Sequence, residues 1–287
     1  EPQTRIDPIV TGNMIHQIVE NFYKDVKGVP FKDLTSLLGE KAEERLATIF
    51  EQAWKEVESK HAEVSQKVIA KAKQAWWKKI RRWLAAEKGR FWENQELAEM
   101  AIFQLEEPVE LNLELSNNKT ITLTGKIDRI DIDEHGFVIY DYKSSFKRLD
   151  FDNEIPDGFV LQIPIYMIAL EHEFTNGKFK NQALSHTKPI GGGYITIKEP
   201  DLRKKNTVWT EEHKHRFEPR YKTNVQQLDS ETLKRTYSVT ELIEKIWIKT
   251  TTDFSVKPYH PSVCKYCSFK SICRVTTELQ NTEEVEV

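Results

Sequence analysis

The middle of the chain carries the alternation of apolar and polar residues that predicts β-strands. Residues 107–115 alternate in this way, and residues 120–133 follow after a turn at two asparagines. Residues 137–140 are apolar throughout, which is typical of a strand buried on both faces. A turn signal at 134–136 separates the last two runs. The pattern therefore predicts three consecutive strands that end in a hairpin.

Apolar residues at helical spacing predict helices on either side of these strands. Residues 11–27 are predicted to form one helix and residues 31–106 a long helical region, whereas residues 159–172 and 229–250 are predicted to form two later helices. The expected fold class is α/β (α+β): a central mixed β-sheet flanked by helices, with a long helical N-terminal region.

The remaining stretches are predicted from their turn residues and their polarity. Residues 146–157 are expected to form a loop, and Gly191–Gly193 is expected to lead into a strand at 194–197. Residues 199–227 are polar and are expected to form a loop or an insertion. The acidic C-terminal tail, residues 276–287, is expected to be disordered.

Charged residues lie near the ends of the predicted hairpin strands. Asp141 and Lys143 are two residues apart, so on a strand both project from one face. The hairpin brings Asp128 back toward Asp141, and neighbouring carboxylates repel each other unless a positive charge lies between them. A surface hairpin with solvated charges is one interpretation. A bound divalent cation that activates a water molecule is the interpretation that accounts for all three residues together.

Composition narrows the class of protein. The 287 residues are 39% hydrophobic and 30% charged, as expected of a globular protein with a hydrophobic core. No apolar run is long enough to span a membrane, and the N-terminus has no signal-peptide pattern. Because the first residue is Glu1 and not Met, we expect an excised fragment or a processed product.

The net charge of −3 does not by itself favour nucleic-acid binding, although one segment is strongly basic. Lys78, Lys79, Arg81 and Arg82 surround tryptophans within the long helical region. They form either the solvated face of an amphipathic helix or a groove that follows a nucleic-acid strand. We expect both uses, with most tryptophans in the core and the basic face toward DNA.

The segment Asp141-Tyr142-Lys143, preceded by Asp128, resembles the D…(D/E)-x-K signature of the PD-(D/E)XK nucleases, in their RecB-type branch. Ile127 stands where the family name has its proline. The resemblance implies a restriction-endonuclease-like core and a deoxyribonuclease that uses Mg²⁺ or Mn²⁺. It also implies that Asp128, Asp141 and the main-chain carbonyl of Tyr142 hold the metal, and that Lys143 activates the attacking water.

The order of further motifs extends this resemblance. Gly12-x-x-x-His16 resembles the histidine motif of RecB-type nucleases, which implies that His16 binds the metal; a packing histidine is the alternative. Glu110 matches the acidic residue that the family often carries near the metals, or is an exposed strand residue. Gln162 and Tyr166 resemble the Q-x-x-x-Y motif, whose residues border the active site and contact DNA phosphate.

Three cysteines, Cys264, Cys267 and Cys273, lie within ten residues. A clustered odd set argues against disulfides and for an intracellular metal or cluster site, so we expect a cytoplasmic protein. The C-x-x-C-x5-C spacing resembles the iron–sulfur staple of the AddB subunit of AddAB helicase–nucleases. The resemblance implies a 4Fe–4S cluster in the intact protein, with a fourth cysteine upstream of Glu1. A zinc site completed by His260 and reduced structural cysteines are alternatives.

The resemblance implies a helical region at 1–106, a nuclease core at 107–275 and the C-terminal tail. It further implies an exonuclease domain of a helicase–nuclease for double-strand break repair by recombination. Its substrate would be single-stranded DNA ends, its partner a helicase–nuclease subunit, and no membrane would be involved. The chain has no helicase motif. A catalytically silent DNA-binding or assembly module and a stand-alone exonuclease with a cysteine metal site are alternatives.

Overall fold

The computed structural model divides the chain into one compact unit that ends at Thr240 and a second that begins at Glu241. The described residues are 6–116, 118–145, 161–179, 187–198, 206–217, 224–225, 228–235 and 238–252. The predicted loop at 146–157, the cysteine cluster with His260 and the C-terminal tail lie outside these residues.

A mixed six-stranded sheet forms the centre of the first unit, with its strands in chain order. The strands are β1 (Ala101–Glu114), β2 (Thr120–Asp133), β3 (Gly136–Lys143), β4 (Pro189–Thr196), β5 (Thr207–Trp209) and β6 (Asn224–Val225). Neighbours β1, β2 and β3 pair antiparallel, β3 and β4 pair parallel, β4 and β5 antiparallel, and β5 and β6 parallel. The mixed sheet and the β2–β3 hairpin confirm the prediction from the sequence.

The described residues also form eight helices. They are α1 (Pro8–Tyr23), α2 (Phe31–Leu38), α3 (Ala42–Ser59), α4 (Gln66–Glu87), α6 (Gln162–Thr175), α7 (Lys214–Phe217), α8 (Ser230–Arg235) and α9 (Val239–Thr252). The short turns η1 (Lys24–Val26) and η2 (Gly39–Lys41) join N-terminal helices, and η3 (Lys88–Trp92) and η4 (Gln95–Leu97) lie between α4 and β1. Among the described helices, none combines the length and the apolar composition that crossing a membrane requires.

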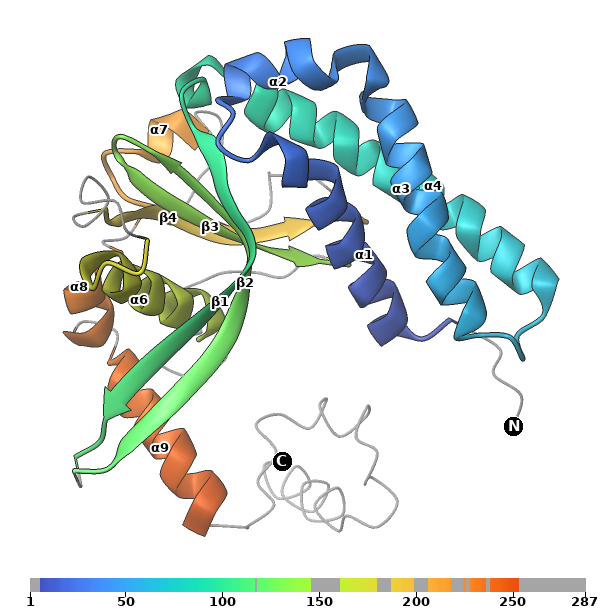
Figure 1. The fold of residues 1–287 in the computed structure, drawn as a ribbon. Helices are drawn as coiled ribbons and strands as arrows, with labels where there is room; N and C mark the ends of the chain where they lie inside the picture. Colours follow the sequence, from blue (N-terminus) through green and yellow to red (C-terminus); the bar gives the residue numbers. More distant parts are fainter. Residues whose placement is uncertain are drawn as a thin grey trace, which may run out of the picture. The chain divides into compact units, whose positions relative to one another are not determined.

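The alternation along β3 divides its side chains between two layers. Val138, Tyr140 and Tyr142 belong to the hydrophobic core that α1 to α4 form with the sheet. Ile139 and Asp141 point the other way, toward α6, where Asp141 is hydrogen-bonded to a residue of that helix. Figure 1 shows α1 to α4 on one side of the sheet and α6 on the other. The strand that carries the predicted catalytic residues is therefore fixed between two helical layers.

Two boundaries differ from the prediction. Helix α1 begins at Pro8, three residues earlier than expected, because Asp7 caps it by accepting a hydrogen bond from the Ile9 amide at 2.7 Å. Strand β1 begins at Ala101, six residues before the predicted strand, and the long helical region ends with the turn at Leu97. Ala101 pairs with Ile132 near the end of β2, so pairing with a distant strand overrides the local helical pattern.

Three later stretches also differ. The expected loop at 199–227 includes β5, α7 and β6, and the single helix expected at 229–250 is divided into α8 and α9. The three glycines predicted to precede a strand lie inside β4. A Cβ atom at Gly191 would lie 1.8 Å from the Trp209 ring, and one at Gly192 would lie 2.6 Å from the Met167 methyl group. The glycine triplet therefore serves close packing of neighbours on the sheet.

Candidate metal centre and catalytic strand

Three side chains with metal-binding atoms converge from α1, β1 and β2. His16 Nδ1 lies 3.1 Å from Glu106 Oε1 and 3.4 Å from Asp128 Oδ1. One ligand atom from each residue lies within 4.8 Å of the others. Within the described part of the chain, this is the one group of three or more His, Cys, Asp or Glu residues with that geometry. One imidazole nitrogen with carboxylate oxygens is a donor set that fits a hard divalent cation such as Mg²⁺ or Mn²⁺.

Asp128 lies where the sheet forks. Strand β2 pairs with β1 between Thr120 and Ile132 but with β3 only from Arg129 to Asp133, so Asp128 is the first residue beyond the three-stranded part. Figure 1 shows β1 and β2 extending beyond the rest of the sheet as a long two-stranded arm. The Tyr142 amide donates a hydrogen bond to Asp128 Oδ2 at 2.7 Å, which leaves Oδ1 directed toward His16. The fork thus orients the carboxylate.

The acidic partner contributed by β1 is Glu106, and the expected residue, Glu110, lies outside the group. Glu110 is exposed and pairs with Thr124. It lies four residues beyond Glu106 on β1, further along the arm. Glu106 adopts a left-handed φ of 51°, which is uncommon for a residue other than glycine and redirects its side chain out of the regular strand. It also forms an ion pair with Lys126. The sequence interpretation missed Glu106 because the predicted strand began at residue 107, one residue after it.

The D-x-K segment makes a second, continuous set of contacts with α6. Lys143 Nζ lies 2.6 Å from Asp141 Oδ2, and Gln162 Nε2 donates to Asp141 Oδ1 at 2.7 Å. The same amide of Gln162 lies 3.4 Å from the hydroxyl of Tyr166, one helical turn further on. The structure thus brings together Asp141, Lys143, Gln162 and Tyr166, as expected from the sequence. Pro164 is compatible with α6 because it lies in the first turn, where the amides have no partner within the helix.

Electrostatic interactions connect the group of His16, Glu106 and Asp128 with the Asp141–Lys143 pair. Burial, followed by the charge of Asp128, raises the pKa of Asp141 to about 6, against the opposing effect of Lys143. Hydrogen bonds to Asp128 and then to Glu106 raise the pKa of His16 to about 10. The carboxylates thus concentrate negative charge that a positive group must balance. A divalent cation would supply that charge.

A buried ionic network lies beneath the site. Arg129 is fully buried and makes two hydrogen bonds to Asp131, at 2.7 and 2.8 Å. It also donates to Glu87 of α4 at 2.8 Å and to the Tyr142 hydroxyl at 3.0 Å, while the Tyr23 hydroxyl of α1 donates to Glu87 at 2.9 Å. The network therefore joins α1, α4, β2 and β3. The alternation of β2 did not reveal it, because its partners are distant in the sequence.

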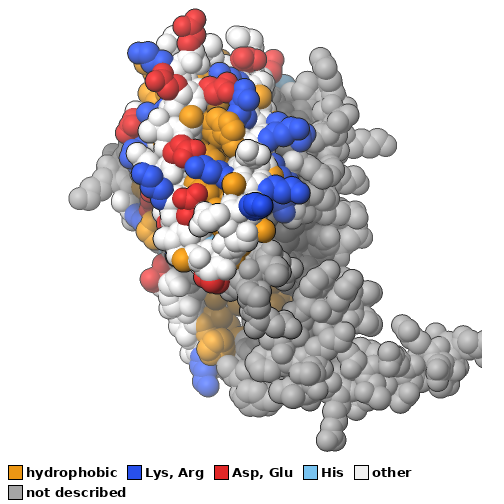
Figure 2. All heavy atoms as spheres, turned by 90° about the vertical axis from the view of Figure 1, so that its right-hand side faces the viewer, with side chains coloured by type: hydrophobic (Ala, Val, Ile, Leu, Met, Phe, Trp, Pro, Cys, Tyr) orange, Lys and Arg blue, Asp and Glu red, His pale blue; other side chains and the backbone are white. Residues whose placement is uncertain are grey.

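The predicted basic face of α4 is divided. Lys78, Arg81 and Arg82 are exposed, and Arg81 forms an ion pair with Glu43 of α3. Lys79 lies elsewhere on the helix, with its amino group 4.6 Å from the centre of the Trp76 ring. Figure 2 shows the side of the molecule on the right in Figure 1, where acidic and basic side chains lie intermixed. The described residues of α4 therefore do not form a continuous basic surface.

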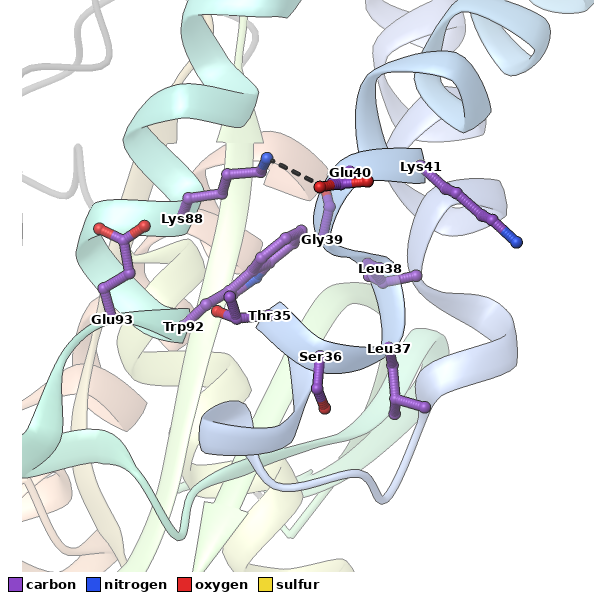
Figure 3. A pocket seen from close by; sticks show the side chains of 10 residues that line it. All are labelled: Thr35, Ser36, Leu37, Leu38, Gly39, Glu40, Lys41, Lys88, Trp92 and Glu93. Carbon is purple, nitrogen blue, oxygen red and sulfur yellow. Dashed lines mark hydrogen bonds between the residues drawn. The ribbon is translucent and has the colours of Figure 1, made fainter.

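A separate hollow lies between α2, η2 and η3. Figure 3 shows its lining, in which the Lys88 amino group points to the turn at Gly39 and lies 3.4 Å from that residue's carbonyl oxygen. Lys41, Glu40 and Glu93 also line it. Its lining includes neither the group of His16, Glu106 and Asp128 nor the contacts of the D-x-K segment with α6. The hollow is thus a feature of the helical layer and separate from the candidate site.

Comparison with known proteins identifies the family of the chain. The family model of the PD-(D/E)XK nuclease superfamily matches residues 1–274. The chain is 23% identical over 223 residues to a protein of Clostridium kluyveri that is named as a subunit of an ATP-dependent helicase/deoxyribonuclease, covering 60% of this chain and 19% of that protein. A protein of the same name from Alkaliphilus oremlandii is 28% identical over 203 residues, covering 67% of this chain and 17% of the relative.

A third relative of that name, from Lysinibacillus sphaericus, is 34% identical over 98 residues, covering 32% of this chain and 8% of the relative. The chain therefore spans less than a fifth of the length of the relatives that it matches. The family model, by contrast, extends over nearly the whole chain and includes both converging sets of residues. The resemblance inferred from the D-x-K segment is confirmed, and the chain belongs to the PD-(D/E)XK nuclease superfamily.

Proposed function

We propose that this chain is a metal-dependent deoxyribonuclease domain that hydrolyses phosphodiester bonds as an exonuclease. The observation that carries the proposal is the convergence of His16, Glu106 and Asp128 beside the Asp141–Lys143 pair. A scaffold without catalytic activity does not need Glu106 and Asp128 at one point with Asp141 close enough to feel the charge of Asp128, because repulsion between carboxylates raises the free energy of the folded state. The membership in a nuclease superfamily supports the same reaction class.

The metal ligands and Lys143 have different proposed roles in the reaction. His16, Glu106, Asp128 and Asp141, with the carbonyl of Tyr142, would hold Mg²⁺ or Mn²⁺, and such an ion supplies Lewis-acid stabilisation of charge that develops on the phosphate. Lys143 lies at the same strand end as Asp141, which holds its amino group in place. That amino group orients the attacking water and stabilises the negative charge that forms on the phosphoryl oxygens.

Gln162 and Tyr166 are proposed to position the substrate. Their side chains lie beside Asp141 on the α6 side of β3. Tyr166 is partly accessible, and its hydroxyl is a donor suited to a phosphate oxygen. Polar groups held next to a metal ligand in this way would fix the orientation of the phosphate relative to the metal.

The names of the matched relatives support a wider role. Two relatives are named as subunits of an ATP-dependent helicase/deoxyribonuclease, and we propose that this domain works beside a helicase–nuclease subunit in the repair of double-strand breaks by recombination. Single-stranded DNA ends remain the proposed substrate. A 4Fe–4S cluster held in part by Cys264, Cys267 and Cys273 remains part of the proposal on the strength of their spacing.

A nuclease assay tests the proposal. The chain is incubated with labelled single-stranded DNA and Mg²⁺, with EDTA as the control, and Lys143→Ala is compared with the parent protein. We expect cleavage that requires the metal and that falls about 10²–10⁴-fold or more in the variant. Near-normal turnover of Lys143→Ala would refute the mechanism. Binding of DNA without cleavage in any divalent metal would favour the silent binding module instead.

A further inference from the structure

Two lysines from different parts of the chain converge on one tryptophan. Trp76 of α4 is largely buried, with 7% of its surface exposed. The amino group of Lys79 lies 4.6 Å from the centre of its ring, and that of Lys198, just after the end of β4, lies 5.9 Å away. Both distances are within the range of cation–π attraction, so the indole holds the two ammonium groups near each other.

This pair lacks the acidic partners that other basic residues of the helical layer have. Lys73 and Arg81, also on α4, form ion pairs with Glu51 and Glu43. Among the residues that the structure describes, Lys79 and Lys198 pair with no carboxylate. Burial lowers the pKa of Lys79, and the charge of Lys198 lowers it further, as expected when a second cation lies nearby. An anion bound between them would relieve this repulsion.

The pair lies next to the catalytic strand. The Lys198 amide donates to the carbonyl of Ser144, the residue after Lys143, and the Ile197 amide donates to the carbonyl of Lys143 itself. On α4, Trp83 packs edge-on against Tyr142 with ring centres 6.3 Å apart. Trp76 precedes Trp83 by two helical turns, about 10 Å along the axis. The two lysines therefore stand just past the end of β3, beyond the D-x-K segment.

We infer that Lys79 and Lys198 bind a backbone phosphate of the DNA strand that is cleaved at the metal centre, with Trp76 holding their ammonium groups in place. The inference rests on the proposed nuclease function and adds to it a second contact point for the substrate. Two lysines with no acidic partner suit a phosphodiester, whose single negative charge is spread over two oxygens. They would direct the strand from the metal centre over the ends of β3 and β4.

Binding without cleavage tests this inference. Fluorescence anisotropy with a labelled single-stranded oligonucleotide in EDTA is measured over a range of salt concentrations. The variants are the double variant Lys79→Ala/Lys198→Ala, the conservative Lys198→Arg, and Lys55→Ala as a control that removes an exposed lysine from α3. For a lost contact to a single strand, the slope of log affinity against log salt falls by about 0.7.

We expect the double variant to bind more weakly at low salt and with a slope smaller by about 0.7 or more, whereas Lys55→Ala and Lys198→Arg keep the parent slope. If the parent binds and cleaves DNA but the double variant keeps its slope, the inference is wrong and the proposed function stands. If the parent neither binds nor cleaves, the proposed function and the inference both fail. Circular dichroism confirms that each variant is folded.

Discussion

The buried cation Arg129 offers the most quantitative prediction. Replacing it in the variant Arg129→Met leaves the carboxylates of Asp131 and Glu87 in the core without their main partner, since both are fully buried. Removal of one partner from a buried ion pair costs about 3–5 kcal/mol, because the remaining charge stays away from water. Arg129 also packs near four aromatic rings, of which Phe91 is closest at 4.3 Å, so its loss removes packing as well.

We therefore expect Arg129→Met to lower the free energy of unfolding by about 3–5 kcal/mol at neutral pH, measured by urea denaturation. The matched control is Arg82→Met, an exposed arginine of α4, which should change stability by about 0.5 kcal/mol or less. A loss of about 1 kcal/mol or less in Arg129→Met would refute the view that the network anchors the helical layer to the sheet.

The pH dependence of this loss follows from the same network. Burial raises the pKa of Asp131 from 3.8 to about 6, while Arg129 opposes the rise. Without the cation, the pKa of Asp131 in the folded state rises further. A carboxyl whose pKa is higher in the folded than in the unfolded state makes the protein less stable as pH rises through that interval. Below about pH 6 Asp131 is protonated in both folded proteins, so both lose stability alike, and the deficit of Arg129→Met relative to the parent should grow only as pH rises above about 6.

Two further predictions concern the site. Glu106→Gln should weaken Mn²⁺ binding, measured by calorimetry, by about tenfold or more. Glu110→Gln on the same strand should leave the affinity unchanged. If instead Glu110→Gln weakened binding and Glu106→Gln did not, Glu110 would be the metal ligand, as the sequence predicted. Gly125→Ala should displace the Tyr166 ring, because the added Cβ would lie 2.6 Å from its Cε1, and should cost about 1–3 kcal/mol of stability together with DNA affinity. Unchanged melting and binding would show that the ring is free to move aside.

The hairpin could be predicted from the sequence because its signals are local. The alternation along residues 120–133, the turn at 134–136 and the apolar run that follows place Asp128 opposite Asp141 without any knowledge of the remaining fold. The spacing of Gln162 and Tyr166 is likewise a property of one helix. These residues were therefore expected to meet, and the structure brings them together.

The residues that were missed depend on distant partners. Glu106 joins His16 because β1 extends further back along β2 than its own sequence indicates, and because one residue adopts a left-handed conformation within the strand. Arg129 gave no signal of its partner Glu87, 42 residues away on α4. The packing role of Gly191 requires Trp209, which lies in a stretch that was expected to be a loop. Long-range pairing of this kind is not written in any single segment.

The position of His16 has a consequence for how the site assembles. Its partner Glu106 is 90 residues away in the chain, so the cluster requires α1 to be docked against β1 and β2, a contact of high sequence separation. Metal binding would then be thermodynamically linked to that docking, and saturating metal would protect α1 from local unfolding and proteolysis. Conversely, anything that lifts α1 away would remove one donor while Asp141 and Lys143 stay in place on β3.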